Sequence, residues 1–223
     1  SPYLDGLFDD IMNSSNIKFQ AIIETNRGCP FPCSFCFWGQ GGLNTRYRFF
    51  SVDRVEKIAN WLGLNKIEYV FCADSNFGIF KRDVEISQYF AETKREYGYP
   101  EKFRVCYGKN SEETIYQCGK ILCDADMEKG ITLSRQSNDL NTLVNIKRQN
   151  IKLSVYNNLA RKYDLEGIPV YTEFILGLPG ETYESFLNGL NEILECTVKT
   201  QIFIYFCQIL NNTELSQPDY MKK

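Results

Sequence analysis

The sequence alternates apolar runs with amphipathic stretches, and this alternation constrains the fold more than any other feature. Short runs rich in β-branched and aromatic residues predict strands at 19–25, 67–73, 103–107, 130–134, 167–176 and 200–207. Apolar residues at helical spacing predict helices at 51–62, 83–97, 112–123, 140–146, 151–165 and 182–196. Strands that alternate with helices pair in parallel through right-handed crossovers, so the pattern predicts an α/β fold with a parallel sheet.

Three cysteines, Cys29, Cys33 and Cys36, stand close together on the loop that follows the first predicted strand. Pro30 and Pro32 restrict the backbone between the first two, so the loop can aim three thiolates at one point, as a soft metal centre requires. A structural zinc or an ordinary ferredoxin-type cluster takes four protein ligands, and this loop offers no fourth. The spacing therefore predicts a metal centre with one open position.

Composition excludes several other classes of protein. The sequence has no histidine, which rules out Ser-His-Asp and Cys-His catalysis and histidine-bound zinc within this chain. The formal net charge is −3 and no Lys/Arg run is visible, so nucleic acid is an unexpected partner. No apolar run has transmembrane length and residues 1–6 do not resemble a signal peptide, so we expect no membrane partner and a cytoplasmic protein.

The cysteine spacing resembles the signature of radical S-adenosylmethionine (SAM) enzymes, with Phe35 as the aromatic before the third cysteine. In that family three cysteines hold a 4Fe–4S cluster, and the amino and carboxylate groups of SAM chelate the fourth iron. One electron then cleaves SAM to methionine and a 5′-deoxyadenosyl radical. The resemblance implies that Cys29, Cys33 and Cys36 are the metal ligands. It also implies a partial (β/α)6 barrel, an open TIM-like barrel.

The resemblance suggests three parts of the chain: a lead-in or linker at 1–18, a radical SAM core domain at 19–210 and a C-terminal tail at 211–223. In such barrels ligands bind at the C-terminal ends of the strands. Polar residues follow several of the predicted strands, and the resemblance gives each group a role toward SAM. No catalytic residue is assigned.

After the second strand, Asp74, Ser75 and Asn76 offer oxygen acceptors for the SAM amino group, although an Asx-type turn without a ligand is the alternative. After the fourth strand, Ser134 and Gln136 could hydrogen-bond the ribose hydroxyls. Beyond the next helix, the resemblance places Arg148 as the carboxylate-binding arginine, with a solvated surface position as the alternative.

The adenine side is expected after the fifth and sixth strands. Ile175 and Gly177 lie in a segment that resembles the family's adenine-side motif, although a plain strand-to-helix turn is the alternative. Gln208 could present backbone groups to the adenine edge, with Phe35 beside the same ring. Lys109, Tyr171 and Glu173 are unranked candidates for contact with cofactor or substrate.

Segments 1–8, 22–29 and 74–78 resemble the cobalamin-binding subclass, many of whose members transfer a methyl group from methylcobalamin to an unactivated carbon or phosphorus. The chain has no Asp-x-His-x-x-Gly pattern and no histidine, so we expect an excised core or a reduced stand-alone member, and a cobalamin-binding domain, if one is used, outside this chain. The resemblance implies SAM cleavage, followed by hydrogen abstraction or methyl transfer on a small molecule, sugar or peptide. A flavodoxin or ferredoxin would supply electrons. The alternatives are a cluster- and SAM-binding module that needs a cobalamin domain or a partner chain, and a metal-stabilised structural domain.

Overall fold

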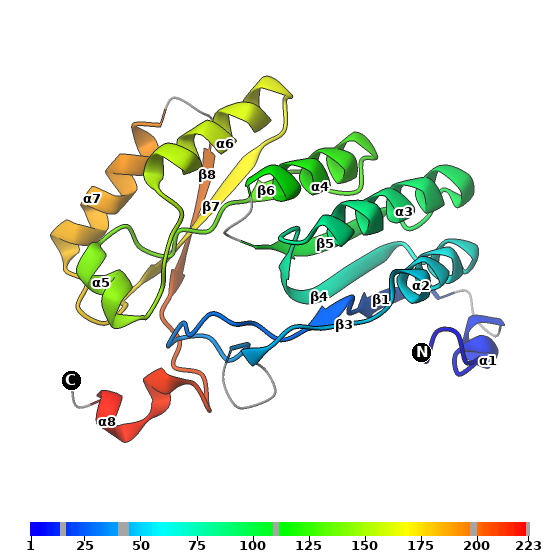
Figure 1. Cartoon of the computed structure of the whole chain (residues 1–223), viewed down its shortest axis with the longest axis horizontal. Coiled ribbons are helices and arrows are strands. Elements are labelled where there is room, and N and C mark those ends of the chain that lie inside the picture. Colours follow the sequence, from blue (N-terminus) through cyan, green and yellow to red (C-terminus); the bar gives the residue numbers. More distant parts are fainter. Residues whose placement is uncertain (14–16, 40–44, 109–111, 197–199, 222–223) are drawn as a thin grey trace. The chain divides into compact units, whose positions relative to one another are not determined.

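The computed structural model describes residues 1–13, 17–39, 45–108, 112–196 and 200–221. The chain forms two compact units. Unit 1 comprises Ser1–Asn26 and Arg48–Lys129, and unit 2 comprises Arg27–Tyr47 and Gly130–Lys223. Each unit contains a three-stranded sheet with helices packed beside it (Figure 1). The chain therefore builds the predicted α/β architecture from two parallel sheets.

Unit 1 has a parallel sheet in the order β1-β4-β5. Its elements are α1 (Asp9–Asn13), β1 (Gln20–Ile23), β3 (Arg48–Phe49), α2 (Val52–Leu64), β4 (Tyr69–Phe77), α3 (Lys81–Tyr97), β5 (Lys102–Tyr107) and α4 (Glu112–Asp124). The short strands β2 (Asn26–Arg27) and β3 form a separate two-stranded sheet.

The helices of unit 1 pack on one face of the sheet. Alternate strand residues are buried, which gives β1 and the first half of β4 an apolar face, whereas the buried positions 74 and 76 of β4 are polar. That core includes the following buried residues from strands and helices: Ala21, Ile23, Val55, Leu62, Val70, Ile86, Phe90, Phe103 and Leu122. The Ser51 side chain accepts a hydrogen bond from the Arg54 N–H at 3.3 Å, so α2 begins where its N-cap predicts.

Unit 2 has a parallel sheet in the order β6-β7-β8. Its elements are β6 (Ile131–Thr132), α5 (Leu140–Asn145), α6 (Leu153–Leu165), β7 (Val170–Leu176), α7 (Tyr183–Leu194), β8 (Thr200–Phe206), the 3-10 helix η2 (Glu214–Ser216) and α8 (Pro218–Met221). The buried hydroxyl groups of Tyr156 and Thr172 share a hydrogen bond, which ties α6 to β7.

Several elements differ from the sequence expectation. Strand β4 continues from the predicted end at Ala73 to Phe77, and its pairing with β5 shifts register between Cys72 and Phe77. The polar residues Asp74, Ser75 and Asn76 thus lie where the pairing with β5 is irregular. Strand β6 is shorter than predicted. The predicted lead-in contains α1, and the Tyr3 hydroxyl donates to the Ile22 carbonyl at 2.6 Å.

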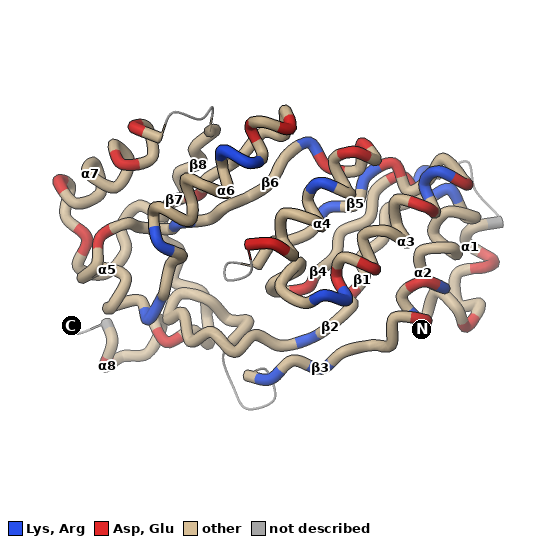
Figure 2. The backbone as a smooth tube through the Cα atoms, turned by 45° about the horizontal axis from the view of Figure 1, so that its top comes forward, with Lys and Arg blue, Asp and Glu red and all other residues tan. Residues whose placement is uncertain are grey.

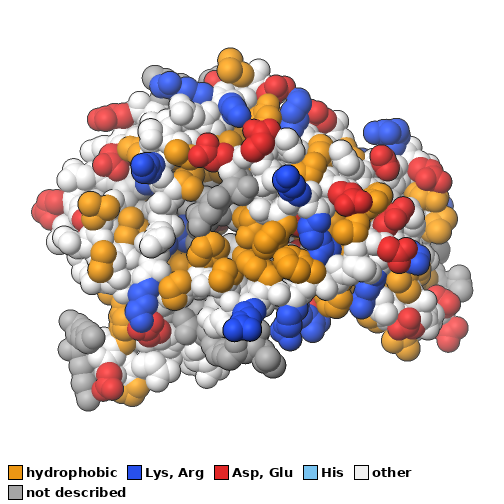
Figure 3. Space-filling view, in the orientation of Figure 1, with side chains coloured by type: hydrophobic (Ala, Val, Ile, Leu, Met, Phe, Trp, Pro, Cys, Tyr) orange, Lys and Arg blue, Asp and Glu red, His pale blue; other side chains and the backbone are white. Residues whose placement is uncertain are grey.

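Charged and apolar groups are mixed on the surface. Lys, Arg, Asp and Glu are interspersed along the helices (Figure 2), and apolar side chains lie among them on the face seen in Figure 3. Among the helices in the described part of the chain, none combines the length and the apolar character that a membrane crossing requires.

One buried carboxyl group should make unit 1 sensitive to pH. Burial raises the pKa of Glu128 to about 7. Two hydrogen bonds to its carboxylate oppose this shift: the Tyr107 hydroxyl donates at 2.7 Å and the Val105 N–H donates at 3.3 Å. The folded-state pKa lies above the ordinary value of 4.5. The contribution of Glu128 to the free energy of unfolding is therefore fully present below pH 4.5 and is lost as the pH rises through 7.

Glu128→Gln should therefore gain stability relative to wild type between pH 4.5 and 8, by at most about 3 kcal/mol, as measured by urea unfolding of the full chain. The exposed hydrogen bond from the Tyr89 hydroxyl to Glu85 provides a matched control. Glu85→Gln should change the unfolding free energy by less than about 0.5 kcal/mol. A Glu128→Gln difference that does not change with pH would contradict the assignment.

Candidate functional site

The cysteine loop is held by backbone hydrogen bonds within unit 2. The Ser34 N–H donates to the Ile146 carbonyl at 3.0 Å, and the Ser34 carbonyl accepts from the Leu215 N–H at 3.1 Å. The Cys36 N–H donates to the Cys33 carbonyl at 3.1 Å, which closes a tight turn between these two cysteines. The loop is therefore fixed between the second and third ligand positions.

Close packing at Gly39 ends the same loop. A Cβ atom at this position would lie 2.1 Å from the Phe31 carbonyl oxygen, so only glycine fits without a backbone shift. Cys29 and Cys33 are buried and Cys36 is half-buried. All nine cysteines lie in the described residues and none forms a disulfide.

The three thiol groups influence one another. Burial raises the pKa of Cys33 and Cys36, and the neighbouring thiols of the loop raise it further. The Arg148 guanidinium opposes this effect and lowers the pKa of both groups. The Arg148 charge thus partly offsets the burial that disfavours the thiolate form, which a metal ligand requires.

An iron–sulfur cluster and a single metal ion make different demands on the spacing of the three thiols. Among the described residues, no three cysteine or acidic side chains gather closely enough to hold one metal ion. A single zinc would need sulfur atoms about 4 Å apart, whereas each cysteine of an iron–sulfur cluster binds a different iron. The buried Ser34 hydroxyl, which has no hydrogen-bond partner in the described part of the chain, also leaves a donor available to a cluster sulfur.

A pocket of about 510 Å³ lies in unit 2 at the ends of β7 and β8. It is lined by Phe35, Gln136, Glu173, Ile175, Ile204, Tyr205, Phe206, Cys207, Gln208 and Leu210. Four of these, Phe35, Gln136, Ile175 and Gln208, are residues that the sequence predicts as SAM contacts. Phe35 belongs to the cysteine loop, so the loop and the pocket are contiguous.

The backbone around Gln136 shapes one wall of this pocket. Gln136 has a φ of 67° and its N–H donates to the Glu173 carbonyl at 2.7 Å. The Ile175 N–H donates to the Gln136 carbonyl at 2.8 Å. After β7, Gly177 turns the chain with a φ of 90°, which glycine adopts without strain.

Glu173 is the acidic residue of the pocket lining. Its carboxylate accepts a hydrogen bond from the Ser134 hydroxyl at 2.5 Å. Ser134 therefore reaches the pocket through Glu173. Sequence reasoning named Glu173 only as an unranked candidate, and it missed Ile204, Tyr205, Phe206 and Leu210. Alternation along β7 is the signal that could have ranked Glu173 with Ile175.

Arg148 is buried, with 4% of its surface exposed, so the alternative of a solvated surface position is wrong. Its Nε donates to the Asn150 side chain at 2.8 Å and its Nη2 to the Ser134 carbonyl at 2.7 Å. Burial lowers the pKa of Arg148 to about 10, while Cys33, Cys36 and Glu173 oppose that shift. The side chain thus lies near both the thiols and the acidic wall of the pocket.

Asp74, Ser75 and Asn76 belong to unit 1 and lie inside β4, so the predicted loop after the strand is wrong. The Asp74 carboxylate is buried and accepts from the N–H of Thr25 at 2.7 Å and of Asn26 at 3.2 Å. It also accepts from the Thr25 hydroxyl and from the Asn26 side chain at 2.7 Å. Burial raises the pKa of Asp74 although these hydrogen bonds lower it. Its four lone-pair sites are filled by protein donors.

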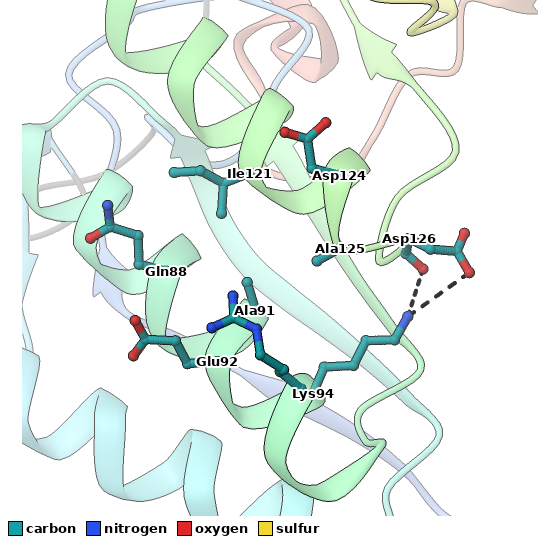
Figure 4. A pocket seen from close by; sticks show the side chains of 9 residues that line it. Gln88, Ala91, Glu92, Lys94, Ile121, Asp124, Ala125 and Asp126 are labelled. Carbon is teal, nitrogen blue, oxygen red and sulfur yellow. Dashed lines mark hydrogen bonds and ion pairs between the residues drawn. The ribbon is translucent and has the colours of Figure 1, made fainter.

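A second pocket, of about 660 Å³, lies between α3 and α4 of unit 1 (Figure 4). Lys94 crosses it and donates to the Asp126 carbonyl at 2.8 Å, with the Asp126 carboxylate 3.9 Å away. This pocket is larger than the one in unit 2, but none of its lining residues is a predicted cofactor contact. The Lys94 ammonium group is already bound to Asp126. Of the two other unranked candidates, Tyr171 packs against Phe203 with ring centroids 5.9 Å apart and lines neither pocket, and Lys109 lies outside the described residues.

Comparison with known proteins identifies the family. The sequence matches the radical SAM superfamily over residues 23–193, which includes the cysteine loop and most of both sheets. The chain belongs to the radical SAM superfamily. Members of this superfamily use a 4Fe–4S cluster and SAM, so the predicted family and cofactors are confirmed.

Curated radical SAM relatives point to the cobalamin-dependent subclass. The chain is 40% identical, over its full length, to the cobalamin-dependent radical SAM methyltransferase TokK of Streptomyces tokunonensis. It is 39% identical, over 98% of its length, to 2-(S-pantetheinyl)-carbapenam-3-carboxylate methyltransferase of Streptantibioticus cattleyicolor. The chain spans about a third of the length of each relative (33% and 32%).

Solved radical SAM structures share the fold. The methyltransferase TsrM of Kitasatospora setae, solved with cobalamin and a 4Fe–4S cluster, superposes with a TM-score of 0.69 at 17% identity. That match covers 89% of this chain and 36% of TsrM. The predicted fold, the partial (β/α)6 barrel of this superfamily, is thereby confirmed.

The hydrogen bonds of Asp74 predict a structural role. Asp74→Ala would leave two backbone and two side-chain donors buried without an acceptor, so it should lower the unfolding free energy by roughly 3 kcal/mol or more. Urea unfolding of the full chain measures the loss. Asp53→Ala, which removes an exposed ion pair with Lys57, should cost less than about 1 kcal/mol. Equal losses in the two variants would refute this role.

Proposed function

We propose that this protein is a radical SAM enzyme that holds its 4Fe–4S cluster through Cys29, Cys33 and Cys36 and binds SAM in the adjoining pocket of unit 2. The observation that carries the proposal is the position of Phe35. This residue lies between two of the cysteines and also lines the pocket. A ligand in the pocket would therefore lie beside the open position of the metal centre.

The pocket lining suits an adenosine group. Phe35 and Ile175 offer apolar surface to an adenine ring, and the backbone at Gln208 offers polar groups to its edge. Gln136 and Glu173 can hydrogen-bond ribose hydroxyls, with Ser134 holding the Glu173 carboxylate in place. The turn at Gly177 leaves the end of β7 open to a planar group.

The amino-acid end of SAM requires acceptors and a cation. For the amino group, Ser75 and Asn76 of unit 1 stay a prediction from the family resemblance, whereas Asp74 is directed to Thr25 and Asn26. Arg148 was expected at the carboxylate, but its burial and its proximity to the thiols favour a role toward the metal centre. When bound, the cluster supplies the electron that breaks the C5′–S bond of SAM and yields methionine and a 5′-deoxyadenosyl radical.

The relatives support methyl transfer to a small molecule as the overall reaction. Both curated relatives are named methyltransferases, and one name specifies a carbapenam carboxylate. We infer that cobalamin supplies the methyl group and is bound by protein outside this chain. A flavodoxin or ferredoxin would supply the electron in the cytoplasm. The predicted sugar or peptide substrates have no such support.

The length of the relatives favours a second candidate, a cluster- and SAM-binding module that requires further protein for turnover. The two candidates share the same cofactor site. They differ in whether the chain releases 5′-deoxyadenosine from SAM under reducing conditions.

Anaerobic reconstitution with iron and sulfide tests the site. Wild type should hold about four irons per chain and change its visible spectrum when SAM is added. Cys29→Ala should lose most of the iron, because two cysteines cannot hold the cluster. Cys106→Ala, which removes an exposed cysteine on β5, is the matched control and should keep it. A spectrum indifferent to SAM, or equal iron in both variants, would reject the proposed site.

Turnover with SAM and dithionite then separates the candidates. The enzyme should release 5′-deoxyadenosine, or a methylated product when cobalamin and substrate are added. A chain that binds the cluster and SAM but yields neither product above background would be the binding module.

A further inference from the structure

Arg148 is a buried cation whose hydrogen bonds leave its charge uncompensated. The turn after α5 carries it inward, and its backbone N–H donates to the Leu143 carbonyl at 2.9 Å. Its side chain donates to the amide oxygen of Asn150 and to the carbonyl of Ser134, both of which are neutral. Glu173, an acidic group near enough to act on it, is bonded to the Ser134 hydroxyl.

The same turn is bonded directly to the cysteine loop. The carbonyl of Ile146, two residues before Arg148, accepts the N–H of Ser34, which separates Cys33 from Phe35 and Cys36. The Arg148 charge acts on the thiols of Cys33 and Cys36. A positive group is thus fixed beside two of the three proposed ligands by backbone contacts.

Ser34 adds a second group directed to the metal centre. The residue is fully buried, and its hydroxyl has no hydrogen-bond partner in the part of the chain that the structure describes. A buried hydroxyl without an acceptor costs about 1–3 kcal/mol. Sulfur atoms of a cluster held by Cys33 and Cys36 would supply the missing acceptor.

We propose that Arg148 and the Ser34 hydroxyl raise the reduction potential of the 4Fe–4S cluster. The proposal rests on the proposed function only in assuming that the cluster binds at these cysteines. Uptake of one electron makes the cluster and its thiolates more negative by one charge. A buried cation and a hydrogen-bond donor stabilise that reduced form more than the oxidised form, because the surroundings exclude water.

The test is a potentiometric titration of the reconstituted full chain, followed by electron paramagnetic resonance of the reduced cluster. Arg148→Gln should lower the ratio of reduced to oxidised cluster about tenfold at a fixed applied potential, equivalent to about 59 mV for one electron. Ser34→Ala should shift it in the same direction. Arg148→Lys keeps the charge and should remain closer to wild type than Arg148→Gln.

Arg135→Gln is the matched control for loss of a buried arginine. Arg135 has 6% of its surface exposed and donates to Asn138 and to the Ile151 carbonyl, and the charges that act on it are those of Tyr156, Glu192 and Cys196. Its replacement should leave the potential unchanged.

Iron and SAM binding measured on the same samples distinguish the possible failures. Wild type without a cluster would refute the proposed function and this inference together. An intact cluster whose potential is the same in wild type, Arg148→Gln and Ser34→Ala would refute the inference alone. Weakened SAM binding at an unchanged potential would instead assign Arg148 to the SAM carboxylate. If Arg148→Gln does not assemble a cluster, the reduction potential of the Ser34→Ala cluster decides whether the inference holds.

Discussion

The candidate site depends on the backbone of Ser34, which is hydrogen-bonded on both sides. Its N–H donates to the Ile146 carbonyl after α5, and its carbonyl accepts from the Leu215 N–H in η2. The ion pair between Lys147 and Glu214, at 2.6 Å, joins the same two segments. Because these contacts use main-chain atoms, the spacing of the cysteines is set by the fold of unit 2. A site built in this way is organised before a cofactor arrives, which lowers the entropy lost on binding.

Most of the fold could be predicted from the sequence, because strand and helix patterns are local. Ser51 and Gly98 mark the start of α2 and the end of α3 as expected. Strand β4 could not be delimited, since Asp and Asn are unfavourable in strands. The Asp74 carboxylate remains buried there only because Thr25 and Asn26, distant in sequence, surround it with donors.

The candidate site was predictable only in part. The cysteine spacing is local, and it identified the metal ligands proposed here. The pocket depends on register between strands, which pairs Ile175 with Tyr205 and Glu173 with Phe203. The sequence alone does not show how residues of neighbouring strands pair. The residues of β8 that line the pocket could therefore not be distinguished from ordinary core residues.

Two buried charges show how structure separates roles that sequence could not. Asp74 and Arg148 were both expected at SAM, and both are almost fully buried. All four acceptor sites of Asp74 are used by Thr25 and Asn26, so its carboxylate holds the segment that follows β1 against β4. Arg148 binds only neutral oxygens and keeps its charge beside Cys33 and Cys36. A buried charge costs several kcal/mol unless something offsets it. For Asp74 the offset lies within the protein, whereas for Arg148 the proposed thiolates and the cluster bound to them would complete it.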